Sequence, residues 1–333
     1  MRHSSTLVPG AQTMKLSVSI YCISVLKPAL LFLLAFVSLS FSPNLSTNLA
    51  LKNPKNEIAT TYPLIRDQRD IELQNKLQSL IVEMNLTAEV DAKKLGIALV
   101  DISDELNPKY AGINDDTMMY AASLPKIAIL FGLFKQAEQG IVELHDDLLI
   151  QANAMIRTSS NEAATSLLKL VGIKYLANLL QSPDYLLYEK QTGGGLWVGK
   201  FYDKEVAQLR DPINNLSHGA SPLKVAEFYY LLATNRLVNK TLTEKMKAIM
   251  ADPGIPHKFV KGLDSACPLA KLYRKSGTWL DWHSDSAIVS HGGKTYIAVA
   301  LIQDEKGGEW LTEMIKRFDQ MIFSGQSESG CIA

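Results

Sequence analysis

The sequence predicts an α+β fold, in which one antiparallel sheet is built from both chain ends, flanked by helices, and interrupted by an inserted all-helical domain. Two observations lead to this prediction. Strand-like apolar runs lie near both ends of the chain, whereas nearly all of 121–253 has the spacing of helices. The elements predicted at the two ends are a helix over 70–85, strands over 95–103, 269–279, 286–291 and 294–304, and a closing helix over 309–322.

The N-terminal 42 residues do not belong to this fold. Three basic residues, Arg2, Lys15 and Lys27, precede an apolar run from Ala29 to Phe41, and small residues follow it. A basic start, a short apolar stretch and a small-residue exit are typical of an export signal. The run is shorter than the roughly 20 residues that span a bilayer. We therefore expect 1–42 to be an export signal, with an uncleaved N-terminal anchor as the alternative, and the protein to be periplasmic or secreted.

The remaining chain divides into a linker and one catalytic domain. Residues 43–65 are rich in Asn, Ser, Thr and Pro without periodicity, which predicts a linker. The domain over 66–330 would comprise a sheet part, 66–120 with 255–330, and a helical part, 121–254. Glycines 292 and 293, before Lys294, predict a tight hairpin between the last two strands.

Composition excludes several classes of function. The 34 basic and 34 acidic side chains give a net charge of zero, so no basic surface for nucleic acid is expected. Outside the N-terminal segment only Cys267 and Cys331 remain, and the histidines have no metal-ligand spacing. We expect no metal and no cofactor. Two free thiols are the simpler interpretation of the cysteines, although a single bridge between them stays open.

The pair Ser123 and Lys126 is the first candidate for chemistry. Ser-x-x-Lys occurs four times in the chain, but only Ser123 heads the most apolar helix. Residues three apart on a helix share a face, so the amine can approach the hydroxyl. Burial disfavours the ammonium form and lowers the lysine pKa, which makes the amine a base near neutral pH.

Two later fragments fit the same chemistry. Ser159 offers a hydroxyl that can relay a proton, and Asn161 an amide that can hold a substrate carbonyl. On a predicted strand, Lys275, Ser276, Gly277 and Thr278 offer an extended backbone that can pair with a peptide-like substrate. Each fragment alone is also explained by a helix cap or a solvated strand charge. The order of the three fragments along the chain is more specific than any one of them.

Ser-x-x-Lys, Ser-x-Asn and Lys-Ser/Thr-Gly in this order resemble the penicillin-recognising serine hydrolases, most closely class A β-lactamases. The resemblance covers roughly 67–323. It implies an acylated nucleophile, a base or relay lysine, a hydroxyl that shuttles the proton to the leaving nitrogen, substrate ligands and an oxyanion hole made of two backbone N–H groups. The nucleophile would be Ser123, the base or relay lysine Lys126, and the proton shuttle Ser159. The substrate ligands would be Asn161, Lys275, Ser276, Gly277 and Thr278. The backbone N–H groups of Ser123 and Thr278 would form the oxyanion hole.

The sequence also departs from that family. The Glu-x-x-Leu-Asn pattern, whose glutamate activates the hydrolytic water, is absent. The resemblance would place that acid at Glu205, seventeen residues before Pro222, with Asp211 and Glu189 as rivals. The strand after Lys-Ser-Gly-Thr-Trp lacks the arginine that often binds the substrate carboxylate and has His283, Ser284 and Asp285 instead.

These observations predict an exported serine hydrolase that opens β-lactam amides through an acyl-enzyme at Ser123. A D-Ala-D-Ala peptidase or another acyl hydrolase is one alternative, and a non-turnover penicillin-binding or cell-wall-sensing module is another. The expected partner is a small β-lactam or D-alanyl peptide, and the expected state is a monomer that binds neither nucleic acid nor metal.

Overall fold

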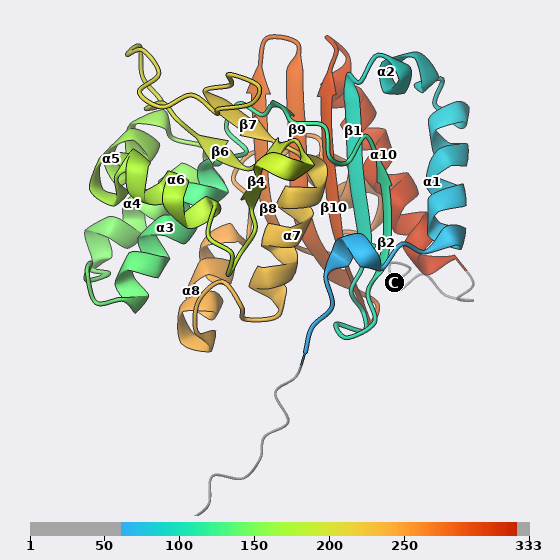
Figure 1. The fold of residues 1–333 in the computed structure, drawn as a ribbon. Helices are drawn as coiled ribbons and strands as arrows, with labels where there is room; N and C mark the ends of the chain where they lie inside the picture. Colours follow the sequence, from blue (N-terminus) through green and yellow to red (C-terminus); the bar gives the residue numbers. More distant parts are fainter. Residues whose placement is uncertain (1–60, 325–333) are drawn as a thin grey trace, which may run out of the picture. The chain divides into compact units, whose positions relative to one another are not determined.

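A five-stranded antiparallel sheet forms the centre of the computed structural model, which describes residues 61–324. The predicted export segment and most of the linker lie outside these residues. The strand order is β2-β1-β10-β9-β8, and β1 pairs with β10 so that Leu95 lies opposite Ile302 (Figure 1). The two chain ends therefore share one sheet, which confirms the predicted fold class. The strands are β1 (Leu95–Asp101), β2 (Lys109–Ile113), β8 (Lys271–Trp279), β9 (Trp282–His291) and β10 (Lys294–Gln303).

The sheet separates two apolar cores because successive side chains of a strand point to opposite faces. In β1, Ile97 and Leu99 pack into one core, whereas Ala98 and Val100 pack into the other. The first core is covered by α1, α9 and α10, and the second lies beneath α7 (Figure 1). The helices are α1 (Ile71–Glu83), α7 (Pro222–Ala233), α9 (Phe259–Ala266) and α10 (Gly307–Phe323); the short α2 (Thr87–Asp91) and η1 (Ile65–Asp67) lie near the N-terminal end of the described chain.

The inserted part is a group of helices beside β8. Its central helix, α3, is buried continuously from Lys126 to Phe134, as the apolar sequence predicts. Its helices are α3 (Lys126–Glu138), α4 (Asp146–Arg157), α5 (Asn161–Val171), α6 (Ile173–Leu180) and α8 (Lys240–Met250). Within 61–324 no single helix is long and apolar enough to cross a membrane; α5 and α6 meet that criterion only as a pair bent by 81°.

The prediction that nearly all of 121–253 is helical is wrong for 188–220. Gly193, Gly194 and Gly195 have φ values of 85°, 110° and 152°, which glycine adopts readily and which a helix excludes. This segment forms short strands instead: β6 and β7 join β3 in a small sheet of order β3-β7-β6, and β4 pairs with β5. The elements are β3 (Met119–Tyr120), β4 (Tyr188–Glu189), η2 (Lys190–Thr192), β5 (Gly194–Gly195), β6 (Trp197–Val198) and β7 (His218–Ala220).

Two local predictions can be compared with the structure. Gly292 and Gly293 have φ values of 54° and 75°, so the predicted tight hairpin between β9 and β10 is confirmed. Cys267 is disulfide-bonded, so the expectation of a free thiol there is wrong. Sequence could not decide this point, because a bridge depends on two side chains meeting in the folded chain.

Candidate active site

Ser123 lies in the turn that joins β3 to α3. The backbone N–H of Lys126 donates to the Ser123 carbonyl at 3.3 Å, which places the serine one turn before the lysine. Ala122, just before it, has a φ of 50°, a strained conformation for a residue with a side chain. The hydroxyl of Ser123 makes no hydrogen bond to any residue in 61–324. It is partly exposed at a cavity of about 170 Å³ that Asn161 and Thr278 also line. A nucleophile there is open to a small substrate.

Lys126 is completely buried, as expected, and its amine turns toward the loop between α4 and α5. Nζ donates to the Ser159 carbonyl and to Asn161 Oδ1, both at 2.7 Å, and lies 3.4 Å from Ser159 Oγ. Burial lowers the pKa of Lys126 to about 7. A neutral amine has two N–H groups and one lone pair. The two short bonds use both N–H groups, which leaves the lone pair to accept a proton.

Ser159 and Asn161 of the α4–α5 loop are available to bind Lys126 because the residue between them, Ser160, caps helix α5. Ser160 Oγ accepts from the Ala163 N–H at 3.1 Å and so serves as the N-cap of α5. Ser159 has a φ of 60°, which is unusual for serine and turns its carbonyl and hydroxyl toward Lys126. Neither Ser159 nor Asn161 is therefore the helix cap that the sequence left as an alternative.

Lys275 enters the same cluster from the edge strand β8. Its Nζ donates to Ser159 Oγ at 3.0 Å and to the Ser276 carbonyl at 2.7 Å, and its side chain is buried. Burial, and next the positive charge of Lys126, lower the pKa of Lys275 well below its usual value. The Ser159 hydroxyl therefore bridges two lysines that are far apart in sequence.

The backbone of Ser123 and the backbone of β8 meet at the cavity where the resemblance places the oxyanion hole. The Ser123 N–H makes no hydrogen bond to another residue of the described chain, and Thr278 lines the same cavity. Gly277 allows this approach: a Cβ there would lie 2.3 Å from the Ala121 carbonyl and 2.9 Å from the Leu124 nitrogen. Two N–H groups can thus converge on one carbonyl oxygen of a substrate.

Two residues behind β8 were missed by the sequence reasoning. His257 Nε2 lies 3.1 Å from Ser276 Oγ, and Lys258 Nζ donates to Thr278 Oγ1 at 2.8 Å. Burial lowers the pKa of His257 to about 4, so this imidazole is neutral. Both residues come from the segment before α9, about twenty residues from their partners. No local pattern marks them, because only the fold brings them to β8.

The loop between Gly199 and Leu209 was expected to supply the water-activating acid. It is closed at its base, where the Leu209 N–H donates to the Gly199 carbonyl at 2.9 Å, and its tip is exposed. Glu205 lies on that tip, where its carboxylate accepts from Gln208 Nε2 at 3.2 Å. The structure does not bring Glu205 to the cavity, so its assignment as the base that activates water is withdrawn.

Tyr202 of this loop reaches the site instead. Its ring centroid lies 4.5 Å from Lys126 Nζ, and its hydroxyl donates to the Ala122 carbonyl at 3.4 Å. Its ring also packs on His218, at 4.2 Å between centroids. Burial lowers the pKa of His218 to about 4, and its Nε2 lies 3.1 Å from the Lys200 carbonyl. Among the described residues that line the cavity, Asp203 alone carries a carboxylate.

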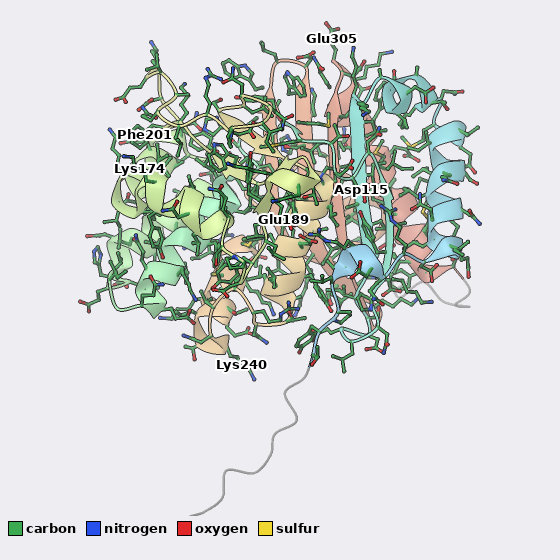
Figure 2. All side chains as sticks on the ribbon, in the orientation of Figure 1. Asp115, Lys174, Glu189, Phe201, Lys240 and Glu305 are labelled. Carbon is green, nitrogen blue, oxygen red and sulfur yellow. The ribbon has the colours of Figure 1, made fainter. Side chains whose placement is uncertain are left out.

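The two rival acids have structural roles. Glu189, labelled in Figure 2, lies in β4. It forms ion pairs with Lys224 of α7 and with Arg66. Asp211 accepts from the Tyr188 hydroxyl at 2.5 Å and from the backbone N–H groups of its own turn. Neither carboxylate lines the Ser123 cavity.

Comparison with known proteins agrees with this geometry. The family model described as "Beta-lactamase enzyme family" matches residues 72–154 and 148–323, which together are most of the chain. The chain belongs to the beta-lactamase enzyme family. This confirms the resemblance to β-lactamase-like serine hydrolases. No curated protein sequence matches the chain.

Solved structures of this family share the fold at low identity. A structure titled "Structure of PBP-A" is 17% identical, with a TM-score of 0.59, over 80% of this chain and 100% of that one. A β-lactamase from Sphaerobacter thermophilus is also 17% identical, with a TM-score of 0.54, over 70% of this chain and 94% of that one. A mutant of PBP-A, titled as an acyl-enzyme complex with penicillin-G, has a TM-score of 0.59 at 17% identity over 79% of this chain and 100% of that one.

Proposed function

We propose that this member of the beta-lactamase family is an exported serine hydrolase that opens β-lactam amides through an ester on Ser123. The observation that carries the proposal is the arrangement around Ser159. The Ser159 hydroxyl lies 3.4 Å from Lys126 Nζ and 3.0 Å from Lys275 Nζ, and Asn161, which also binds Lys126, lines one cavity with Ser123. A nucleophile, a base and a proton relay are the three parts that acyl transfer from an amide requires.

In the acylation step, the neutral amine of Lys126 takes the proton of the Ser123 hydroxyl as Oγ attacks the lactam carbonyl. The oxygen of that carbonyl becomes negative and is bound by the N–H groups of Ser123 and Thr278. The C–N bond then breaks. The leaving nitrogen takes the proton of the Ser159 hydroxyl, and Ser159 regains one from the Lys126 ammonium.

The buried Lys275 would bind the substrate carboxylate. Its pKa is lowered because burial disfavours an isolated charge, and a bound anion offsets that penalty. The site would therefore take up a proton or keep one at Lys275 when an acidic substrate enters. Water must finally break the ester and return a proton to Ser123.

A chromogenic cephalosporin and intact mass spectrometry test this proposal. Steady colour together with an unmodified protein mass indicates hydrolysis. A persistent mass increase that maps to Ser123 indicates an acyl-enzyme that water does not clear. If penicillins and cephalosporins give neither a colour change nor an adduct, the proposed reaction is refuted.

A slow-turnover penicillin-binding protein or D-Ala-D-Ala peptidase is the second candidate, and Tyr202 favours it. The ring of Tyr202 packs against Lys126, and none of the glutamates in 61–324 lines the cavity, so activation of water is left to Asp203. Asp203 Oδ1 already accepts from the Glu205 N–H at 3.0 Å. This candidate predicts rapid acylation, a long-lived adduct and release of D-alanine from a D-alanyl-D-alanine peptide.

Export is supported by two features. The N-terminal sequence has the pattern of an export signal, and Cys267 is disulfide-bonded. Disulfides form and persist in oxidising compartments outside the cytosol. Fractionation of cells that express the full chain, followed by N-terminal sequencing of the mature protein, tests export and distinguishes a cleaved signal from a retained anchor.

A further inference from the structure

Lys258 is a buried lysine that the chemistry above leaves without a role. Only 3% of its surface is exposed, and its backbone has φ 52° and ψ −119°, which a residue with a side chain rarely adopts. A buried charge and a strained backbone are both unfavourable by themselves. Their occurrence in one residue next to the active site indicates that its side chain is held there by specific contacts.

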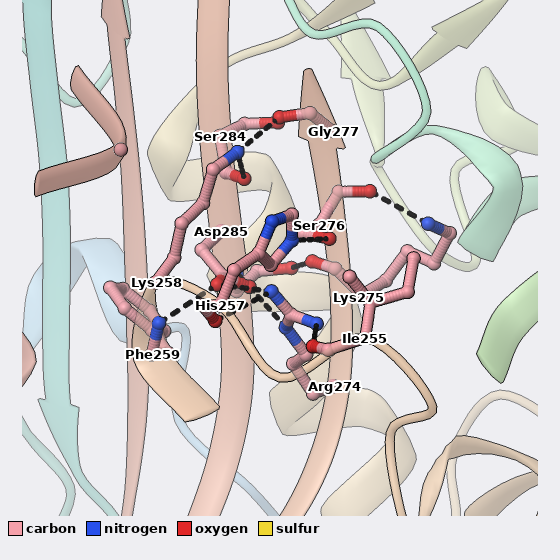
Figure 3. A network of polar contacts seen from close by, with 12 residues as sticks. Ile255, His257, Lys258, Phe259, Arg274, Lys275, Ser276, Gly277, Ser284 and Asp285 are labelled. Atoms are coloured by element: carbon pink, nitrogen blue, oxygen red, sulfur yellow. Dashed lines mark hydrogen bonds and ion pairs between the residues drawn. The ribbon is translucent and has the colours of Figure 1, made fainter. Parts of the chain in front are cut away.

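Those contacts lie on the strand pair that forms the oxyanion hole. Lys258 Nζ donates to the Gly277 carbonyl at 2.6 Å and to the Ser284 carbonyl at 3.2 Å (Figure 3). It also donates to Thr278 Oγ1 at 2.8 Å. The three acceptors match the three N–H groups of an ammonium ion. Lys126, in contrast, has two acceptors at 2.7 Å and a third, Ser159 Oγ, only at 3.4 Å. The geometry around Lys258 is therefore that of a charged lysine.

A second buried pair fixes the segment that carries Lys258. Arg274 binds Asp285 through two bonds of 2.7 Å, and its guanidinium also donates to the carbonyls of Ile255 and His257. Asp285 accepts from the Phe259 N–H at 3.1 Å. The residues on both sides of Lys258 are thus tied to β8 and β9, as Figure 3 shows.

The hydrogen bond from Lys258 to the Gly277 carbonyl can affect catalysis because of where that carbonyl lies. That carbonyl and the Thr278 N–H belong to one peptide group, and in a trans peptide they point in opposite directions. A positive charge on the carbonyl polarises the peptide and makes its N–H a stronger donor. Lys258 lies on one side of this peptide and the Ser123 cavity on the other.

We propose that Lys258 is a positioning residue that holds and polarises the Gly277–Thr278 peptide, so that the Thr278 N–H stabilises the oxyanion formed at Ser123. The inference rests on the proposed acyl-enzyme. Ser284 extends the effect to the nucleophile, since its carbonyl binds Lys258 while its hydroxyl donates to the Ala121 carbonyl at 3.1 Å. One ammonium thereby orients both sides of the oxyanion hole.

The test compares Lys258→Met and Lys258→Gln with Lys261→Met. Methionine keeps the length of the chain without donors or charge, and glutamine keeps a neutral donor. Lys261 lies three residues further along and is exposed. Together with Lys258 it lines a second cavity, of about 380 Å³, that is distinct from the Ser123 cavity, so it is a matched control. Loss of a whole oxyanion-hole donor slows catalysis about 10²–10³-fold. Because the donor is weakened but not removed, we expect the acylation rate constant to fall about tenfold in Lys258→Met, less in Lys258→Gln, and not in Lys261→Met.

Infrared spectroscopy of the penicilloyl adduct distinguishes polarisation from mere packing. With a ¹³C-labelled carbonyl, the ester stretch should move to higher frequency in Lys258→Met, because a weaker oxyanion hole polarises the ester less. Only folded, acylated molecules give this signal, so partial misfolding does not imitate it. A slower acylation with an unchanged stretch, or an unchanged rate, would overturn the role of Lys258 while leaving the acyl-enzyme intact. If the wild type neither hydrolyses a β-lactam nor forms an adduct with one, the proposed function itself is refuted.

Discussion

The low pKa of Lys126 makes a prediction about stability as well as catalysis. In the unfolded chain this lysine has an ordinary pKa of 10.5, and in the folded protein burial lowers it to about 7. Between these two values the unfolded state binds more protons than the folded state. The free energy of unfolding must therefore rise with pH throughout this window. As pH falls from 10.5 toward 7, the penalty for keeping Lys126 neutral in the folded state grows.

The size of the effect follows from the two pKa values. At pH 7 the displaced proton costs the folded state about 4 kcal/mol, and at pH 9 about 2 kcal/mol, from roughly 1.4 kcal/mol per pH unit. Lys126→Met removes this term. The hydrogen bonds to Ser159 and Asn161 are lost as well, but that loss is the same at both pH values. The difference between the two pH values therefore isolates the ionisation of Lys126.

The assay is urea unfolding of the wild type and of Lys126→Met at pH 7 and pH 9. We expect the free energy of unfolding of the wild type to rise about 2 kcal/mol more than that of the variant. Lys275 contributes to this difference, because the charge of Lys126 lowers its pKa. An equal rise in both proteins would show that Lys126 is fully charged in the folded state, and the proposed base would be refuted.

Lys224 provides a control from the same sequence motif. It follows Ser221 by three residues, and only 2% of it is exposed, but it pairs with Glu189 and with Glu227, the latter at 2.7 Å. Lys224→Met leaves those carboxylates with Arg66 alone. We expect it to be destabilised by about 3–5 kcal/mol at both pH values, while each folded molecule still acylates. Lys126→Met, in contrast, should lose acylation, and its free energy of unfolding should differ from that of the wild type by an amount that depends on pH.

Three further predictions concern the reaction. Ser123→Ala should form no adduct with any β-lactam by intact mass, and an adduct elsewhere would show that another residue is the nucleophile. The rate of acylation should fall about tenfold per pH unit below pH 7, since the protonated form of Lys126 is no base, and stopped-flow burst rates at a series of pH values measure this; a flat profile would contradict it. Glu205→Gln should leave the lifetime of the adduct unchanged, because the carboxylate is exposed on the loop tip; a longer lifetime would restore Glu205 as the base.

The sequence by itself was sufficient for the fold class, and it also named the fragments that the fold brings together around Lys126. Periodicity is local, so strands near both ends and helices between them could be predicted without a structure. The order of Ser123, Ser159 and Lys275 also lies in the sequence, and the structure brings these three fragments together. The small strands of 188–220 were missed because glycine conformation, and not apolar spacing, determines that segment.

Only the tertiary structure decided how the site is charged and supported. Glu205 has the expected distance along the chain, yet the closed base of its loop turns it to solvent and Tyr202 inward. Lys258 has no distinguishing sequence context, and it matters because the fold holds it against a peptide about twenty residues away. The physical reason is that a motif fixes only which groups are available, whereas pKa values, donor strength and exposure depend on neighbours that the folded chain supplies.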